Sequence, residues 1–212
     1  LSQDVSVFPD TLGLLVETQR QSPDFAVLSP LQLDGTGTRL DTLYSQHICK
    51  SRQGPAIVSQ LLVNGAVPLP TVEIDFVNAS VWLLSRKCID QVGLFNSAFK
   101  HYGEDCDYAR RVWAKGLHVG IELQSRACHH RSQEANRTSA SPARVRLFAQ
   151  ATILGRLIRE FPSTPFNVLS AFSHCLLCKG THGNSWQNML FRVSLLWFLA
   201  LNLLPALKAR AV

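Results

Sequence analysis

The stretch that decides the fold is HYGEDCDYARRVWAKG, residues 101–116. Residues 104–115 predict a helix that ends at Gly116, because glycine commonly follows the last helical residue. Acidic side chains fill the first turn of this segment and basic ones follow, which is the order that the helix dipole favours. Residues 117–123 then predict a strand that leads into the sequence CHHR at 128–131.

Upstream of this stretch, strand and helix patterns alternate. Residues 1–5 read as the end of a strand, and residues 10–21 predict a helix that opens at Pro9-Asp10-Thr11. The proline-bounded run at 25–30 predicts a buried strand, and a loop follows at 35–38. This alternation is typical of an α/β domain.

Further elements are predicted between these and the deciding stretch. Asn64-Gly65 is a strong hairpin signal, so residues 56–63 and 66–69 are expected to form two paired strands. Residues 72–84 predict another strand, and residues 86–92 predict a short helix followed by a glycine.

The composition supports a folded core and two electrostatically different parts. The 212 residues are 46% hydrophobic and 17% charged, which is too apolar for a wholly disordered protein. Residues 1–125 carry 10 Lys and Arg against 13 Asp and Glu, whereas residues 126–212 carry 11 against 2. A basic region of this kind is suited to nucleic acid or to anionic lipid.

The six cysteines and the first residues favour a cytoplasmic protein. The cysteines are scattered through a chain too long to need disulfide staples, so we expect reduced thiols. The sequence begins at Leu1 without a basic run followed by an apolar one, so no signal peptide is predicted. A zinc site is a weaker interpretation because a second close cysteine pair is missing; its ligands would be Cys175, Cys178, His174 and His182.

The basic part of the chain predicts a linker and a helical tail. Residues 132–143 are polar and read as the linker, and residues 144–160 predict a basic amphipathic helix. Residues 186–207 are apolar but interrupted, and their uninterrupted stretch, Val193–Leu201, is far shorter than the ~20 residues of a membrane span. We therefore expect an interfacial helix on the inner face of the cell membrane rather than a transmembrane one. The structural alternative, which is compatible with membrane contact, is that these helices cover the first domain.

Two parts of the chain resemble family 2 glycosyltransferases. Leu1-Ser2-Gln3-Asp4-Val5 is similar to the strand end that carries their variant D-x-D motif. The longer match follows the family's order of strand, "GGF" turn and "ED" helix; it consists of Phe76-Val77-Asn78-Ala79-Ser80-Val81-Trp82-Leu83-Leu84, Val92-Gly93-Leu94-Phe95-Asn96 and Tyr102-Gly103-Glu104-Asp105-Cys106-Asp107. The ordered elements at matching spacing make the resemblance specific, and it covers roughly residues 1–131.

The resemblance implies a truncated GT-A fold, which is a Rossmann-like mixed sheet flanked by helices, followed by a helical tail. Residues 1–131 would be the acceptor-side and metal-site part of the catalytic domain, and residues 144–212 the basic tail. In the family, the nucleotide-binding segment precedes the D-x-D motif, so we expect a C-terminal part that lacks that segment. Leu94 in place of the second glycine and Ser2 in place of asparagine depart from the family pattern.

The resemblance also implies inverting transfer of a sugar from a nucleotide-sugar donor to a glycan or lipid-linked acceptor, in bacterial cell-surface polysaccharide synthesis. The family assigns Mg²⁺ or Mn²⁺ to the position of Asp4, with His129 as a further ligand, to neutralise the leaving diphosphate. It places the general base at Asp105, with Glu104 orienting the acceptor hydroxyl. Acceptor contacts are expected from Trp82, which suits core packing equally well, and from Tyr102, Asp107 and Arg111.

Structural alternatives stand beside these assignments. Asp4 is suited to capping a loop, Glu104 and Asp105 are suited to capping a helix, and His129 is suited to an ordinary surface or core position with its hydrogen bonds satisfied. Asp107 and Arg111 stand four residues apart, which favours a helical salt bridge. For the whole protein, the alternative is a noncatalytic relic or a membrane-surface interaction module. Nucleic acid is not an expected partner, because the tail has few aromatic side chains for stacking on bases.

Overall fold

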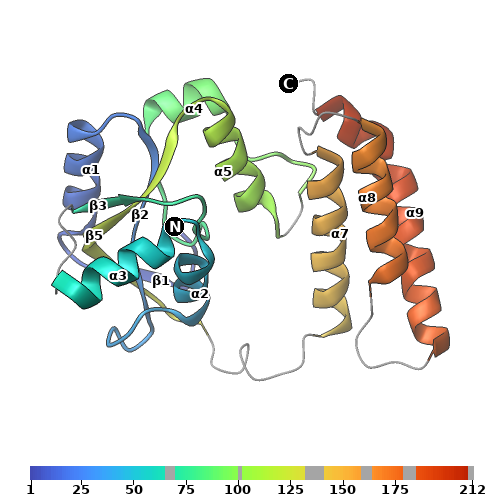
Figure 1. Cartoon of the computed structure of the whole chain (residues 1–212), viewed down its shortest axis with the longest axis horizontal. Coiled ribbons are helices and arrows are strands. Elements are labelled where there is room, and N and C mark those ends of the chain that lie inside the picture. The colour runs from blue at the N-terminus through green and yellow to red at the C-terminus, as the bar shows by residue number, and fades with distance from the viewer. Residues whose placement is uncertain (65–69, 100–101, 132–140, 159–163, 179–184, 210–212) are drawn as a thin grey trace. The chain divides into compact units, whose positions relative to one another are not determined.

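The computed structural model describes residues 1–64, 70–99, 102–131, 141–158, 164–178 and 185–209 (Figure 1). Contacts within the chain group them into two compact units. The sheet unit comprises Leu1–Phe95 and Tyr108–Ala135, and the helical unit comprises Asn96–Asp107 and Asn136–Val212. The protein is therefore a mixed α/β molecule in which a sheet with flanking helices is followed by a separate group of helices.

The sheet unit is built on a mixed, curled sheet, whose strands among the described residues are β1 (Val5–Val7), β2 (Phe25–Asp34), β3 (Thr71–Glu73), β4 (Leu83–Leu84) and β5 (His118–His129). The strand order is β1-β5-β2-β4, and β3 also pairs with β5. β2 and β5 are parallel, and the other pairs are antiparallel. The strands predicted at 25–30 and 117–123 are confirmed and are longer than predicted. Their mostly buried, apolar sequences are typical of strands covered on both faces.

Helices flank the sheet: α1 (Thr11–Gln21), α2 (Thr42–Lys50), α3 (Gly54–Asn64), α4 (Arg86–Val92) and α5 (Glu104–Ala114). The predictions over 10–21, 86–92 and 104–115 are confirmed to within a residue. Local signals explain this agreement, because Gly93 follows α4 with φ 81° and Gly116 follows α5 with φ 69°. This left-handed conformation favours glycine and ends a helix.

The core of the sheet unit contains fully buried side chains from both strands and helices, among them Val27, Ile74 and Ile121. Two buried tyrosines keep their hydroxyl groups satisfied. The Tyr44 hydroxyl donates to the Pro30 carbonyl over 2.9 Å, and the Tyr108 hydroxyl donates to the Gly93 carbonyl over 3.0 Å. Tyr108 thereby ties α5 to the turn that follows α4.

The hairpin prediction is wrong for its first strand, because residues 56–63 lie inside α3; residues 66–69 lie outside the described residues. Pro55 favours this helix, since proline is well tolerated in a first turn where its missing N–H is not needed. The Gly54 amide also donates to the Ser51 hydroxyl oxygen over 2.9 Å, which fixes the entry to α3. These start signals outweigh the turn signal at Asn64.

The strand predicted over 72–84 is confirmed only at its ends, which are β3 and β4. Between them the backbone leaves the ladder because its polar groups find other partners. The Asp75 carbonyl accepts a hydrogen bond from the Trp113 indole over 2.9 Å, and the Asn78 carbonyl accepts one from the Gln32 side-chain amide over 3.2 Å. The strand expected to end at residue 5 instead begins there, since β1 spans Val5–Val7.

The helical unit consists largely of α7 (Pro142–Ile158), α8 (Thr164–Leu177) and α9 (Ser185–Ala209), which pack side by side (Figure 1). Their core holds buried aliphatic side chains, among them Ile153, Leu157 and Leu195. The helix predicted over 144–160 is confirmed as α7. Of the predicted linker at 132–143, residues 132–140 lie outside the described residues.

The apolar segment predicted over 186–207 forms the single helix α9, which continues through Arg192, Asn202 and Pro205. Its residues Ser185–Ala206 are long and apolar enough to cross a membrane, and 22% of that window is buried inside the protein. The suitability of α9 for crossing a membrane is judged by length and composition only, and core helices of soluble proteins can meet the same criteria.

Replacing Asp41 with alanine is expected to destabilise the protein by about 2–3 kcal/mol. The buried Asp41 carboxylate caps α2 by accepting from the Tyr44 amide over 2.9 Å and accepts from Arg131 Nε over 2.9 Å. Urea denaturation measures the loss. Asp10→Ala is the matched control, because Asp10 precedes α1 without a side-chain cap hydrogen bond and its removal should cost less than about 0.5 kcal/mol. Equal losses for the two variants would contradict this account.

Candidate functional site

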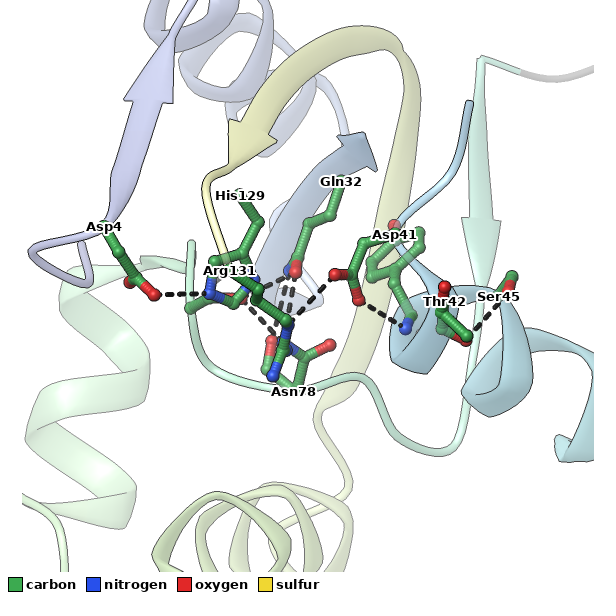
Figure 2. Close-up of polar contacts among 10 residues, drawn as sticks. Asp4, Gln32, Asp41, Thr42, Ser45, Asn78, His129 and Arg131 are labelled. Atoms are coloured by element: carbon green, nitrogen blue, oxygen red, sulfur yellow. Dashed lines mark hydrogen bonds and ion pairs between the residues drawn. The ribbon is translucent and has the colours of Figure 1, made fainter. Parts of the chain in front are cut away.

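The carboxyl ends of the parallel strands β2 and β5 define the candidate site (Figure 2). Asp34, the last residue of β2, is in register with His129, the last residue of β5. β1 runs antiparallel to β5 and places Val5 opposite His129, so the preceding residue, Asp4, arrives at the same edge. Ligands of open α/β sheets bind outside the carboxyl ends of the strands, which makes this edge the expected position of a ligand.

Asp4 and His129 are in direct contact, with Nε2 of His129 lying 3.2 Å from Oδ2 of Asp4 (Figure 2). The His129 side chain is 6% exposed and that of Asp4 is 41% exposed. Burial, and then the charge of Arg131, lowers the pKa of His129 from its ordinary value of 6.5. At neutral pH the contact is therefore a hydrogen bond between a carboxylate and a neutral imidazole.

The Asp4 carboxyl group also has a shifted pKa. Burial raises it, but the combined effects of a charged His129, its own backbone amide and Ser2 lower it overall. The attraction to His129 acts only at acid pH, where that imidazole carries a proton. The hydrogen bonds act at every pH, so Asp4 is an anion under neutral conditions.

Main-chain hydrogen bonds hold the backbone around Asp4. The His130 amide donates to the Asp4 carbonyl over 2.8 Å, and the Ser2 amide donates to the Ser80 carbonyl over 2.8 Å. The Ser6 hydroxyl lies 2.8 Å from Nε2 of His130. The first residues, the end of β5 and the segment around Ser80 are thereby fixed at one place.

A buried polar network in the same region was not predicted from the sequence (Figure 2). Nε2 of the fully buried Gln32 donates to the Ser29 hydroxyl and to the Asn78 carbonyl, each over 3.2 Å. Oε1 of Gln32 accepts from Asn78 Nδ2 over 3.1 Å and from the Ser80 hydroxyl over 2.6 Å. A glutamine inside an apolar strand is the signal for such a network, because buried amides need partners.

Two further groups in this region have a bearing on ligands: the Asn78 amide oxygen, which can accept a hydrogen bond, and the Arg131 guanidinium, which can bind an anion. Oδ1 of Asn78 is shielded from solvent and has no hydrogen-bond partner among the described residues. Arg131, two residues after His129, donates to Asp41 and remains 23% exposed. A guanidinium group is well suited to phosphate, and sequence analysis did not single it out.

Glu104 and Asp105 lie in the first turn of α5, in the part of that helix that belongs to the helical unit. Oδ1 of Asp105 accepts a hydrogen bond from the Cys106 amide over 2.8 Å. Oε2 of Glu104 is shielded from solvent and has no hydrogen-bond partner in the described parts of the chain, so it is suited to accept one from a ligand hydroxyl.

The expected acceptor-binding residues of the sheet unit have structural contacts. Trp82 stacks on Phe95 with ring centroids 6.2 Å apart and an interplanar angle of 17°. Arg111 donates to the Val92 carbonyl over 2.6 Å and to the Leu94 carbonyl over 2.9 Å. Arg111 thereby holds the turn that follows α4.

The expected acceptor-binding residues of the helical unit flank Glu104 and Asp105 in sequence. Tyr102 stacks on Phe148, with ring centroids 4.0 Å apart and an interplanar angle of 15°. Asp107 is buried, with 2% of its surface exposed. The candidate residues therefore fall into two groups: Asp4, His129, Trp82 and Arg111 in the sheet unit, and Tyr102, Glu104, Asp105 and Asp107 in the helical unit.

Asp4 and His129 fit part of a metal site. A carboxylate oxygen and a neutral imidazole nitrogen are ligands that Mn²⁺ accepts, and Mg²⁺ or Mn²⁺ commonly takes its other ligands from water and substrate phosphates. Within the described residues, no group of three or more His, Cys, Asp or Glu side chains forms a complete protein site. The zinc alternative is weaker still, because burial raises the pKa of the Cys175 and Cys178 thiols and disfavours the thiolates that zinc needs.

In buffer that contains a chelator, the free energy of unfolding is expected to fall as the pH drops below about 6.5. Folding lowers the pKa of His129, so below that pH the unfolded chain binds a proton that the folded protein excludes. His129→Gln should reduce this slope in urea denaturation between about pH 7.5 and 5.5. His174 has a pKa lowered by burial and then by Arg156, and it accounts for a remaining slope of the same sign. Identical slopes before and after the substitution would contradict the assignment.

No protein-family model matches the chain, and no curated protein sequence matches it. The chemistry and the geometry of the residues themselves are therefore the basis for a functional proposal. Two arrangements carry it: the carboxylate and imidazole at the ends of β2 and β5, and the two carboxyl groups at the start of α5.

Proposed function

We propose that the protein is a family 2 glycosyltransferase of the GT-A type. It transfers a sugar from a nucleotide-sugar donor to a glycan or lipid-linked acceptor, with inversion, in the synthesis of cell-surface polysaccharide. The observation that carries this proposal is the contact of Asp4 with His129 at the carboxyl ends of the parallel strands. The sequence resemblance assigns these same two residues to one diphosphate and metal site, although they lie 125 positions apart.

The donor's diphosphate binds at the Asp4 and His129 edge. These two side chains would hold Mg²⁺ or Mn²⁺, which neutralises the charge of the leaving diphosphate when it is bound. Asp4 supplies a hard oxygen ligand, and His129 supplies a neutral nitrogen that suits Mn²⁺ better than Mg²⁺. Arg131 adds a positive charge for the same anion.

Asp105 acts as the general base on the acceptor. Its carboxylate takes the proton of the acceptor hydroxyl while the hydroxyl oxygen bonds to the anomeric carbon. The bond from that carbon to the diphosphate breaks on the opposite face, so the anomeric configuration inverts. Glu104 accepts a hydrogen bond from the acceptor and orients it, a role supported by the unpaired, shielded Oε2.

The helical unit attaches the protein to the inner face of the cell membrane. Large apolar side chains are exposed on α8 and α9, among them Phe166 at 65%, Leu177 at 76%, Trp186 at 62% and Trp197 at 68%. Exposed apolar side chains that gather on neighbouring helices are suited to a membrane contact, and Trp is favoured at the boundary between lipid and water. This surface also favours the second candidate function, a membrane-surface module without catalysis.

The experiment that separates the two candidates is a transfer assay. The protein, extended by any in-frame residues encoded ahead of Leu1, is incubated with UDP-, GDP- and dTDP-sugars, Mn²⁺ and bacterial membranes. The glycosyltransferase proposal predicts labelled lipid or glycan product that a chelator abolishes and added Mn²⁺ restores. Vesicle binding without transfer from any donor would contradict the glycosyltransferase proposal and support the noncatalytic membrane-surface module.

A further inference from the structure

The helical unit contains a pocket of about 340 Å³, bounded by Ala98–Phe99, Tyr102, α7 and α9. Its size falls in the range of about 300–1,000 Å³ that is typical of small-molecule sites. The lining is mostly apolar and includes Phe99, Leu147 and Leu154. Of the two lining amides, that of Asn202 already donates to the Phe198 carbonyl of its own helix over 2.8 Å. The pocket therefore suits a hydrocarbon better than a sugar, because buried sugar hydroxyls would need more partners.

The wall of this pocket leads directly into the first turn of α5. Tyr102 lines the pocket and has φ 67°, a strained conformation for a residue other than glycine. Gly103 follows with φ 87°, and a Cβ atom there would lie 3.2 Å from the Phe99 ring and 3.3 Å from the Ala151 Cβ. Glu104 and Asp105 come next. Tight packing against the pocket wall thus fixes the turn that presents the two carboxyl groups.

The same helix forms the pocket wall and an exposed apolar surface. Phe198 and Asn202 of α9 line the pocket, whereas Trp197 and Leu201 are 68% and 59% exposed. α9 also has the length and composition of a helix that contacts lipid. A hydrocarbon chain that leaves a bilayer at α9 therefore meets the apolar pocket on the neighbouring face of the same helix, since Trp197 and Leu201 each precede a pocket residue by one position.

We propose that this pocket binds the hydrocarbon chain of an amphiphilic acceptor, whose polar head presents its hydroxyl to Glu104 and Asp105. The reaction of the acceptor's polar head at the two carboxyl groups rests on the proposed function. The binding of its hydrocarbon chain rests on the pocket alone. The inference selects a lipid-linked acceptor over a soluble glycan, because the part of the protein next to the two carboxyl groups is apolar.

The test is direct binding of a fluorescent fatty acid, 11-(dansylamino)undecanoic acid, to the full chain. We expect saturable binding to one site, displaced by dodecyl phosphate but not by inorganic phosphate. Leu147→Trp places a large ring in the pocket and should weaken binding about tenfold or more. Thr152→Trp adds the same ring to the exposed face of α7 and should change binding less than about twofold.

Gln150→Trp fills the same pocket from its half-buried rim and replaces Leu147→Trp if that variant does not fold. Nonsaturable binding, or equal affinities for the pocket-filling variants and Thr152→Trp, would place the probe on the outer surface and overturn the proposal. The outcomes also separate this proposal from the proposed function. Specific probe binding without sugar transfer would support the hydrocarbon pocket and contradict the proposed enzyme activity. Sugar transfer without specific probe binding would support the enzyme activity and contradict the hydrocarbon pocket.

Discussion

Asp105→Asn is expected to lower the turnover of sugar transfer by a factor of about 10²–10⁴, which is the usual contribution of a general base. Asparagine keeps the size of the side chain and an oxygen that can accept from the Cys106 amide, as Oδ1 of Asp105 does over 2.8 Å. It cannot take a proton from the acceptor hydroxyl. The thermal midpoint Tm should therefore change by only a few degrees while turnover collapses.

Asp90→Asn is the matched control for this prediction. Asp90 is an exposed carboxylate on α4, outside both groups of candidate residues, so its replacement should leave turnover within about twofold. The measurement is initial rate at saturating donor and acceptor, with Tm recorded for both variants. A turnover unchanged by Asp105→Asn would remove Asp105 as the base, and equal losses in both variants would indicate a nonspecific effect.

Asp4→Asn is expected to weaken the binding of Mn²⁺ and pyrophosphate by at least about tenfold, since even the loss of a residue that only supports a metal ligand costs 10–100-fold. Pyrophosphate is the suitable probe because it copies the leaving group and needs no nucleotide pocket. Asparagine preserves an oxygen toward His129 but removes the negative charge that the metal requires. Titration calorimetry of pyrophosphate, with and without Mn²⁺, measures the loss.

Asp34→Asn provides the control for charge at the same edge of the sheet. Asp34 is in register with His129, but its carboxylate accepts from Thr36 and Arg39, and these hydrogen bonds lower its pKa to about 2. Its removal should change the affinity less than about twofold if Asp4 acts as a ligand. If both variants weakened binding equally, the effect would be one of net charge, and the assignment of Asp4 as a metal ligand would fail.

Elements with local start and stop signals could be predicted from the sequence. Gly93 and Gly116 mark the ends of α4 and α5, and both helices are confirmed. The errors arose where contacts distant in sequence decide the structure. Residues 72–84 have strand character, but Trp113 and Gln32 bind the intervening backbone and side chains away from the ladder. Residues 56–63 carry no clear hydrophobic period, so their sequence did not distinguish a helix from a strand ahead of the Asn64-Gly65 turn signal.

The candidate site likewise has a part that local sequence predicts and a part that depends on contacts distant in sequence. The helix position of Glu104 and Asp105 follows from local sequence, whereas the meeting of Asp4 with His129 depends on the register of β1 on β5. Only the resemblance linked those two residues beforehand. The network of Gln32, Asn78 and Ser80 was not predicted, because the strand predicted over 25–30 stops short of Gln32 and the partners lie 46 and 48 positions away in the sequence.

Because β1 is short, the strand next to Asp4 can open while the rest of the sheet stays folded. β1 is held by three register pairs with β5, whereas β2 is paired along most of its length. Strands with so few ladder contacts open at low free energy, without global unfolding. Amide hydrogens of β1 should then exchange with solvent well before those of β2. A bound ion that bridges Asp4 and His129 would slow that exchange, so occupancy of the site and docking of the strand are one thermodynamic event.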